Sequence, residues 1–527
     1  LHKVKLSDTS SSYGGIPLYS DSESVYIEKD DVHTLIIGST GSKKTRLIGM
    51  PALYLYALAG ESFIASDPKG ELYESTMPTL KKYGYKSFVL NLRDPLQSNS
   101  WNPLFMPYRL YKDGFRDKAI ELINDMANCI VKSYLTQEAY WQNSTANLLA
   151  GLILTLFECA EEYKVTLKSL RTLRTQAFGS HESEDGTFIK GESSTLIREK
   201  LLKYLDKSSF IYSLLSGTAD VCEVTRSCIV SQFDQAMQPF FSQDNLIDML
   251  SGTNIDMENF GKRKTAVFLI IPDENTLYHS LISVFIKQCY TRLIHEAQKL
   301  ASKKLPRRVN FLLDEFSSLP QISDFPAMIT ASRSRNIRFN LIIQSVSQLK
   351  KRYGHEAETI KGNCENWVLL HSRELSLLNE IIELCGNKNA DEPLVSVSRL
   401  QTMNKEKGEA FILNKRNYPY IAHLPDIDKY PLIRSKKKGV KYPANKNKAN
   451  FVFNFEEFCF LATPESLSRL FSNRKEEFEN INEGFITEPV FIESSEEELE
   501  ERDIYSSEII LDFITELSAL KKNMKPK

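Results

Sequence analysis

An apolar strand that enters a glycine-containing loop and then an apolar helix constrains this sequence more than any other feature. Residues 32–37 predict the buried strand, residues 38–45 read GSTGSKKT, and residues 47–58 predict the helix. The octapeptide differs at one position from the phosphate-loop pattern GxxxxGK[ST]. In such a loop, backbone N–H groups surround the phosphates, and the start of the helix adds positive potential. The sequence therefore predicts a nucleotide-binding α/β domain.

The loop residues are expected to bind ATP and Mg²⁺ together. Lys44 is predicted to reach the β- and γ-phosphates, and the Thr45 hydroxyl to hold Mg²⁺. The predicted nucleotide-binding residues are Gly38, Ser39, Thr40, Gly41, Ser42, Lys43, Lys44 and Thr45.

Lys43 stands where the pattern has its second glycine. A Cβ atom and a long side chain at this position crowd the backbone that approaches the phosphates. Two interpretations stay open: the Lys43 side chain points outward and the site works, or the loop binds nucleotide poorly or not at all.

Strands and helices alternate on both sides of a helical stretch. The expected strands are 62–66, 86–92, 265–271, 308–313, 338–343 and 367–370, with a hairpin of 409–413 and 420–423; the expected helices include 72–82 and 281–299. Such alternation is typical of a parallel, wound sheet. Residues 105–258 instead carry helical periodicity, interrupted by a polar segment at 178–194 that we expect to be a mobile loop.

Polar residues follow three of the predicted strands. Asp314 and Glu315 end an apolar strand, as do the Mg²⁺-associated acid and the acid that polarises water in phosphate-loop ATPases. Gln344 ends the next strand. Asp67 and Lys69 follow an earlier one, where they either contact ligand or form a salt-bridged turn.

Arg333 and Arg335 precede the strand that ends at Gln344. A ring ATPase needs an arginine that reaches a neighbour's γ-phosphate. Spacing alone favours a pair of surface arginines.

Composition excludes several classes of protein. The 66 Lys and Arg against 68 Asp and Glu exclude a protein that coats nucleic acid with its whole surface, so any DNA contact is local. The eight cysteines are scattered, which argues against a disulfide scaffold or a zinc site and favours a reducing cytosol. The longest apolar run, residues 148–157, is too short to cross a bilayer.

The two ends of the chain differ from the rest. The first thirty residues are expected to be loop-like, apart from residues 25–27. Residues 434–448 contain seven Lys or Arg and no acid, which predicts a linker or a solvated basic strip. The last part mixes aromatic segments with an acidic run at 493–503.

The order and spacing of several short segments resemble the coupling proteins of type IV secretion systems, the ATPases of conjugative DNA transfer. The resemblance covers roughly residues 14–433, and the segments that carry it are 33–38, 66–73, 100–104, 311–316, 332–335, 344–345 and 362–364. It implies an α/β fold: a RecA-like P-loop nucleotide-binding domain with an inserted all-α domain and a C-terminal extension. The corresponding boundaries are 1–104 and 263–433 for the two parts of the RecA-like domain, 105–262 for the insertion and 434–527 for the extension.

The resemblance also implies roles for single residues. Lys44 and Thr45 become the nucleotide and Mg²⁺ residues, Asp314 the Mg²⁺-associated acid, Glu315 the catalytic base and Gln344 the sensor. Arg335 becomes the arginine supplied to a neighbouring subunit, with Arg333 as the alternative.

The partners implied are a homo-hexamer, relaxase-bound single-stranded DNA or a protein substrate, and components of the secretion channel. The protein is expected on the cytoplasmic side of the bacterial inner membrane. Family members usually carry an N-terminal membrane anchor, which this sequence lacks, so attachment through a removed anchor or through a partner is expected.

Two functions from different classes follow. The first is a DNA-stimulated ATPase that drives transfer into the channel. The second is a substrate receptor of the same system whose hydrolysis is impaired by Lys43. A RecA-like motor for another DNA task, such as segregation, fits less well because the chain breaks into a helical domain after Trp101-Asn102-Pro103.

Overall fold

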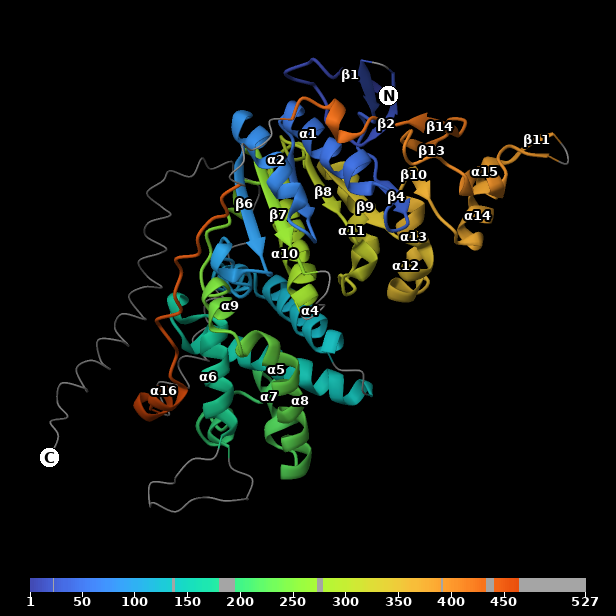
Figure 1. Ribbon diagram of the computed structural model, residues 1–527. Helices are drawn as coiled ribbons and strands as arrows, with labels where there is room; N and C mark the ends of the chain where they lie inside the picture. The colour runs from blue at the N-terminus through green and yellow to red at the C-terminus, as the bar shows by residue number, and fades with distance from the viewer. Residues whose placement is uncertain are drawn as a thin grey trace, which may run out of the picture. The chain divides into compact units, whose positions relative to one another are not determined.

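The computed structural model describes residues 1–463 apart from residues 22, 135–137, 180–194, 273–277, 390–391 and 433–439 (Figure 1). The chain divides into two compact units. The first comprises Leu1–Arg171 and Val224–Phe453, and the second comprises Thr172–Glu223 and Asn454–Lys527. The first unit contains the α/β domain and most of the described helices between its two halves.

A nine-stranded sheet organises the α/β domain. Its order is β14-β13-β10-β4-β9-β8-β5-β7-β6. The strands are β4 (Thr34–Gly38), β5 (Ser62–Ser66), β6 (Lys86–Asn91), β7 (Thr265–Ile270), β8 (Val309–Leu313), β9 (Ile337–Ile343), β10 (Asn366–His371), β13 (Glu409–Asn414) and β14 (Tyr420–His423). The seven strands from β10 to β6 are parallel, and the β13–β14 hairpin continues the sheet antiparallel to β10. The predicted strands and hairpin are confirmed.

The central strands are buried on both faces, as expected of a parallel sheet covered by helices. Every residue of β4 and of its neighbour β9 is buried, and Thr34 pairs with Asn340. Alternate side chains therefore build two separate cores. On one face lie the π-helical turn Thr45–Gly49, α1 (Met50–Ala59) and α2 (Glu71–Lys82).

The opposite face is covered by α10 (His279–Lys299) and α11 (Phe325–Ser332). Phe339 of β9 lies 6.2 Å from the Tyr290 ring of α10 and 5.1 Å from the Phe325 ring of α11. The carboxyl half of the domain adds α12 (Val346–Tyr353), α13 (Glu356–Asn363), α14 (Leu375–Cys385), α15 (Val397–Gln401) and the short hairpin β11 (Asn387–Asn389) and β12 (Glu392–Pro393).

A helical insertion leaves the sheet after β6 and returns at the neighbouring strand β7. Its helices are α3 (Phe105–Lys112), α4 (Arg116–Tyr134), α5 (Ala139–Cys159), α6 (Leu167–Phe178), α7 (Phe210–Ala219), α8 (Glu223–Phe241) and α9 (Asp244–Met249). The segment that leaves the sheet and the segment that returns to it are hydrogen-bonded to each other. Ser100 N donates to Asn254 Oδ1 at 3.0 Å, and Asn254 N donates to Ser100 O at 3.1 Å.

The second unit holds the described part of the region around α7, with the π-helical segment Arg198–Leu202, and the last described helix, α16 (Phe455–Leu461). Within this unit, Gln176 Nε2 donates to Asn454 Oδ1 at 2.8 Å, and Phe455 N donates to Gln176 Oε1 at 2.7 Å.

The expectation of an irregular N-terminus is wrong. Strands β1 (His2–Lys5), β2 (Pro17–Ser20) and β3 (Ser24–Ile27) form a three-stranded antiparallel sheet in the order β1-β3-β2. Each strand has four residues, too few to show alternation in a polar sequence. Their apolar side chains nevertheless join the core beneath α1.

Residues 440–453 correct part of the basic-strip prediction. Tyr442 is half-buried and packs against the core, so this part of the segment is not simply solvated. The rest of the strip at 433–439, the polar segment at 180–194 and the acidic run at 493–503 lie outside the described residues.

Candidate nucleotide site

Five parallel strands bring the predicted site residues, apart from the two arginines, to one edge of the sheet. The strands β10, β4, β9, β8 and β5 are consecutive neighbours, and the carboxyl end of each carries a polar residue. These residues are His371 at the end of β10, the 38–45 loop at the end of β4, Gln344 after β9, Asp314 and Glu315 after β8, and Ser66 and Asp67 at the end of β5. Open α/β sheets place their ligands at this edge.

The phosphate loop is closely packed around Gly38 and Lys44. A Cβ atom at Gly38 would lie 2.4 Å from Ser42 Oγ, so a larger residue there would force the Ser42 side chain to move. Lys44 is 9% exposed, and its Nζ donates to Gly38 O at 2.7 Å and to Ser39 O at 3.3 Å. The ammonium group therefore lies within the curve of the loop, and Thr45 begins the helical turn that follows.

Lys43, which replaces the second glycine of the motif, has a backbone conformation that glycine adopts readily. Its φ is +64°, in the left-handed region that costs an L-residue about 1 kcal/mol or more. Its side chain leaves the loop, and Nζ lies 2.5 Å from Glu406 Oε2, in the turn before β13. This contact lowers the pKa of Glu406 below its ordinary value. The Lys43 side chain is thus directed outward, as the interpretation with a working site requires.

Glu315 and Gln344 lie in direct contact. Gln344 Nε2 donates to Glu315 Oε1 at 2.8 Å and to Oε2 at 2.9 Å, and Thr40 Oγ1 lies 3.5 Å from Gln344 Oε1. Glu315 has a φ of +54°. The strained backbone directs its carboxylate toward β9 and the loop, and strain of this kind is common at functional sites.

Asp314 sits in an environment that disfavours its charged form. Burial, followed by repulsion from Glu315, raises its pKa to about 6, although the nearby Lys44 ammonium opposes this shift. Asp67 also contributes to the repulsion. Two acids held this close are better accommodated when a cation lies between them or one is protonated.

Asp67 is tied to its own turn. Burial raises the pKa of Asp67 to about 6, and its Oδ2 accepts a hydrogen bond from Tyr73 N at 2.9 Å. It therefore caps the start of α2, and no ion pair with Lys69 is present among the described residues. Ser66 Oγ donates to Asp314 O at 2.9 Å, which joins the ends of β5 and β8.

The two predicted arginines lie at the opposite edge of the sheet. They precede β9, whereas Gln344 follows it, and this seven-residue strand separates them by roughly 20 Å. Arg333 forms an ion pair with Glu365 and donates to Asp31 O at 3.0 Å. Arg335 is half-exposed and donates to Ser334 Oγ at 3.3 Å. Neither arginine reaches the phosphate loop of its own chain.

Two neighbours of the loop were not identified from the sequence. His371 Nδ1 lies 2.8 Å from Ser39 Oγ, and its carbonyl accepts from Ser39 N at 3.0 Å. Its place directly after the apolar strand next to β4 was an available signal. Glu406 has no such signal, because it is a single acid between two lysines in a polar turn.

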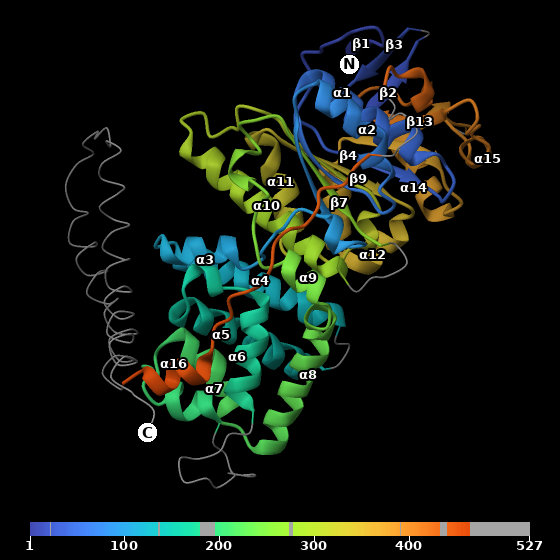
Figure 2. The ribbon, with the colours of Figure 1, turned by 60° about the vertical axis from the view of Figure 1, so that its left-hand side comes forward.

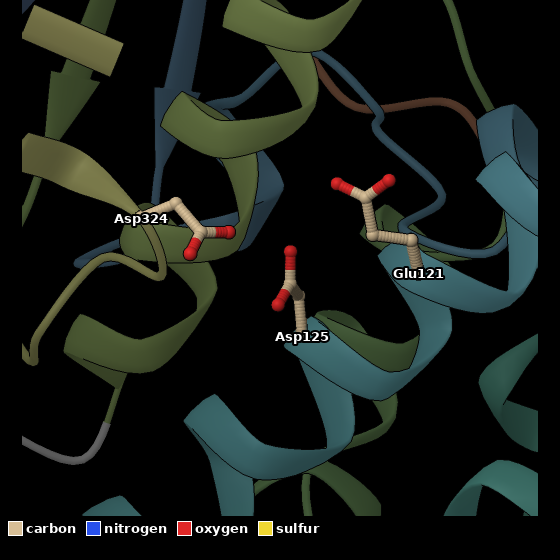
Figure 3. Close-up of side chains that lie close together, drawn as sticks. All are labelled: Glu121, Asp125 and Asp324. Carbon is tan, nitrogen blue, oxygen red and sulfur yellow. The ribbon is translucent and has the colours of Figure 1, made fainter. Parts of the chain in front are cut away.

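A second group of acids has carboxylate oxygens within 4.8 Å of one another (Figure 3). Glu121 and Asp125 lie on α4, and Asp324 directly precedes α11. Lys287 Nζ is 3.3 Å from Asp125 Oδ2 and 3.0 Å from Asp324 Oδ2. The ammonium group thus already pairs with two of the three carboxylates.

The family described as "Type IV secretory system Conjugative DNA transfer" matches residues 6–413. The chain belongs to this family. An uncharacterized protein of Bacillus anthracis is 39% identical over 67 residues, which are 13% of this chain and 25% of that protein. The chain thus matches a quarter of the length of this curated relative.

Solved structures of the plasmid coupling protein TrwB share the fold. The complex with the ATP analogue ADPNP has 17% identity and a TM-score of 0.53, over 80% of this chain and 88% of TrwB. The unbound monoclinic form has 16% identity and a TM-score of 0.55, over 86% and 96%. A third TrwB structure, with ADP and Mg²⁺, has 17% identity and a TM-score of 0.52, over 80% and 89%.

These matches confirm the predicted fold class: a RecA-like P-loop domain with an inserted all-α domain. The predicted domain boundaries stay predictions. Across the part of the chain that the structure describes, no helix combines the length and apolar character needed to span a bilayer.

Proposed function

We propose that this conjugative-transfer protein is a Mg²⁺-dependent ATPase that drives a DNA substrate into a type IV secretion channel. The observation that carries the proposal is the geometry of Lys43. Because this lysine adopts the left-handed φ of the missing glycine and pairs with Glu406, its side chain leaves the phosphate-binding side of the loop clear. The single departure from the motif therefore does not by itself disable the site.

The residues at the carboxyl edge suit each step of hydrolysis. Lys44 would neutralise the β- and γ-phosphates, and the Thr45 hydroxyl and Asp314 would hold Mg²⁺, which would supply charge neutralisation. Glu315 accepts a proton from the attacking water, while Gln344 holds the Glu315 carboxylate and senses the γ-phosphate. The structures of TrwB with ADPNP and with ADP and Mg²⁺ support nucleotide and Mg²⁺ as ligands here.

The assembly proposed is a homo-hexameric ring. Since Arg335 lies at the amino edge of the sheet, it can act only on the nucleotide of a neighbouring copy. Arg335 is preferred over Arg333, whose guanidinium is already paired with Glu365. The same proposal includes relaxase-bound single-stranded DNA or protein as cargo and the secretion channel as partner. It also includes a membrane anchor that is supplied upstream or by a partner.

The test is ATP hydrolysis by the full chain, with and without single-stranded DNA. The account predicts Mg²⁺-dependent turnover by the wild type and a loss of about 10²–10⁴-fold in Glu315→Gln. Lys43→Gly is expected to keep turnover close to wild type. Lys303→Gly is the matched control, because Lys303 also has a positive φ, +53°, in an exposed turn.

Two outcomes would contradict this proposal. Equal turnover by the wild type and Glu315→Gln would remove Glu315 from the chemistry. A silent wild type beside an active Lys43→Gly would identify the protein as the hydrolysis-impaired receptor.

A further inference from the structure

Residues 440–453, which we call the strap, run as an extended segment along the first unit. In Figure 2 the strap is the orange trace that passes from the sheet toward α9. The sequence predicted a linker or a solvated strip, and the proposed ATPase mechanism makes no use of it. Its contacts nevertheless involve both the α/β domain and the insertion.

The first anchor of the strap lies beside the nucleotide site. The Tyr442 ring is 4.8 Å from that of Tyr73, and its hydroxyl donates to Glu74 Oε1 at 3.0 Å. Tyr73 Oη donates back to Lys441 O at 3.1 Å. Tyr442 Oη would lie only 2.9 Å from a Cβ atom at Gly70. The strap therefore packs directly on the turn that begins at Asp67.

The middle of the strap is hydrogen-bonded to the junction between the α/β domain and the helical insertion. Asn445 N donates to Leu96 O at 2.8 Å, and Ser100 Oγ donates to Asn445 Oδ1 at 2.9 Å. Ser100 is also the residue that hydrogen-bonds to Asn254 on the returning chain. The strap thus lies beside the two crossings that connect the sheet to the insertion.

The second anchor lies on the insertion. Asp248 of α9 accepts from Ala449 N at 3.0 Å and pairs with Lys448 Nζ at 2.6 Å. Lys168 Nζ donates to Ala449 O at 2.8 Å. Six residues separate Tyr442 from Ala449, so an extended strap allows little slack between its anchors.

We propose that the strap is a splint that couples the Asp67–Gly70 turn of the nucleotide site to α9 of the inserted domain. A shift of this turn on nucleotide binding pulls on Tyr442 and, through the extended backbone, on Asp248. Conversely, a movement of the insertion changes the packing over Gly70. The coupled part of this inference, that nucleotide binding moves the strap, rests on the proposed function. The mechanical part, that the strap connects the Asp67–Gly70 turn to α9, does not.

Hydrogen exchange of the full chain without nucleotide tests the mechanical part. Asp248→Ala removes the second anchor, and we expect exchange in residues 67–74, on the other domain, to rise at least about threefold. Lys448→Ala, which removes an exposed side chain and is expected to fold normally, should produce a smaller change in the same direction. Lys446→Ala is the control, because Lys446 is an exposed strap residue, and it should leave residues 67–74 unchanged.

The proposal is contradicted if Asp248→Ala and Lys448→Ala accelerate exchange only around residues 446–450. It is equally contradicted if neither variant alters exchange anywhere, or if Lys446→Ala has the same effect as they do.

Addition of ADP and Mg²⁺ tests the coupled part, with binding measured separately by the fluorescence of a labelled ADP. The wild type should become more protected at residues 446–450, and Tyr442→Ala should lose this response while still binding nucleotide. Binding without a response in the wild type would contradict the splint. An absence of binding would contradict the proposed function instead, and the nucleotide-free comparison would then decide on the splint.

Discussion

The two edges of the central sheet use buried charge in opposite ways. At the amino edge, Glu61 precedes β5, and its carboxylate lies 3.0 Å from Arg308 Nη1 and 2.9 Å from Arg338 Nη2. Asn310 Nδ2 and Gly14 N also donate to it, at 2.8 and 3.0 Å. Every strong hydrogen-bonding position of this carboxylate is taken.

At the carboxyl edge, Asp314 and Glu315 have hydrogen-bond donors but no ion pair among the described residues. Asp314 has a raised pKa, Glu315 has a strained backbone, and the Lys44 ammonium group donates to carbonyls of its own loop. Buried charge at the amino edge is thus paired within the fold, whereas the proposed function assigns the acids at the carboxyl edge to a ligand. Substitutions at the two edges should therefore change stability in opposite directions.

The largest effect is expected from Glu61→Gln. This change leaves the fully buried Arg338 guanidinium without a carboxylate, and loss of one partner of a buried pair costs about 3–5 kcal/mol. Glu162→Gln is the matched control, since Glu162 and Arg109 form an exposed pair worth less than about 1 kcal/mol. Urea unfolding measures both. Similar losses in the two variants would remove the distinction between a buried network and a surface pair.

A smaller effect of opposite sign is expected from Asp314→Asn in the absence of nucleotide. Because the folded-state pKa of Asp314, about 6, exceeds its unfolded value, the folded protein loses stability as pH rises from about 4 to 6. Asparagine does not titrate, so the variant should be more stable by on the order of 1–3 kcal/mol at pH 8 and equal to wild type near pH 4. Thermal unfolding at the two pH values measures this. A variant less stable than wild type at pH 8 would contradict a site that is strained without its ligand.

Most of the sheet was predictable, because its strands are short apolar runs bounded by turns. Residues 62–66 and 420–423 match their observed strands residue for residue. The N-terminal sheet was not predictable, since strands such as β1 bury a single side chain, Val4, between exposed lysines. Its apolar side chains join the same core cluster as those of α1, a tertiary arrangement that no local pattern reports.

The site residues that directly follow predicted strands could be identified from the sequence. Contacts made by residues in turns between elements could not. Glu315 and Gln344 were identified separately, and their contact follows from the adjacency of β8 and β9. The Lys43–Glu406 pair joins residues 363 positions apart and depends on the fold of the segment before β13. The direction of the Lys43 side chain, which the first of the two interpretations of the loop requires, was therefore beyond local sequence reasoning.

The most direct test of the contrast between the edges is the melting temperature of the wild type at pH 8 with Mg²⁺ alone and with Mg²⁺ and ADP. A ligand that binds only the folded state stabilises it, and at a hundred times its Kd the gain is about 2.7 kcal/mol. The account predicts a rise of a few degrees in the wild type and none in Lys44→Ala, while Glu162→Gln responds as the wild type does. No rise in the wild type, or the same rise in Lys44→Ala, would contradict a ligand site at the carboxyl edge.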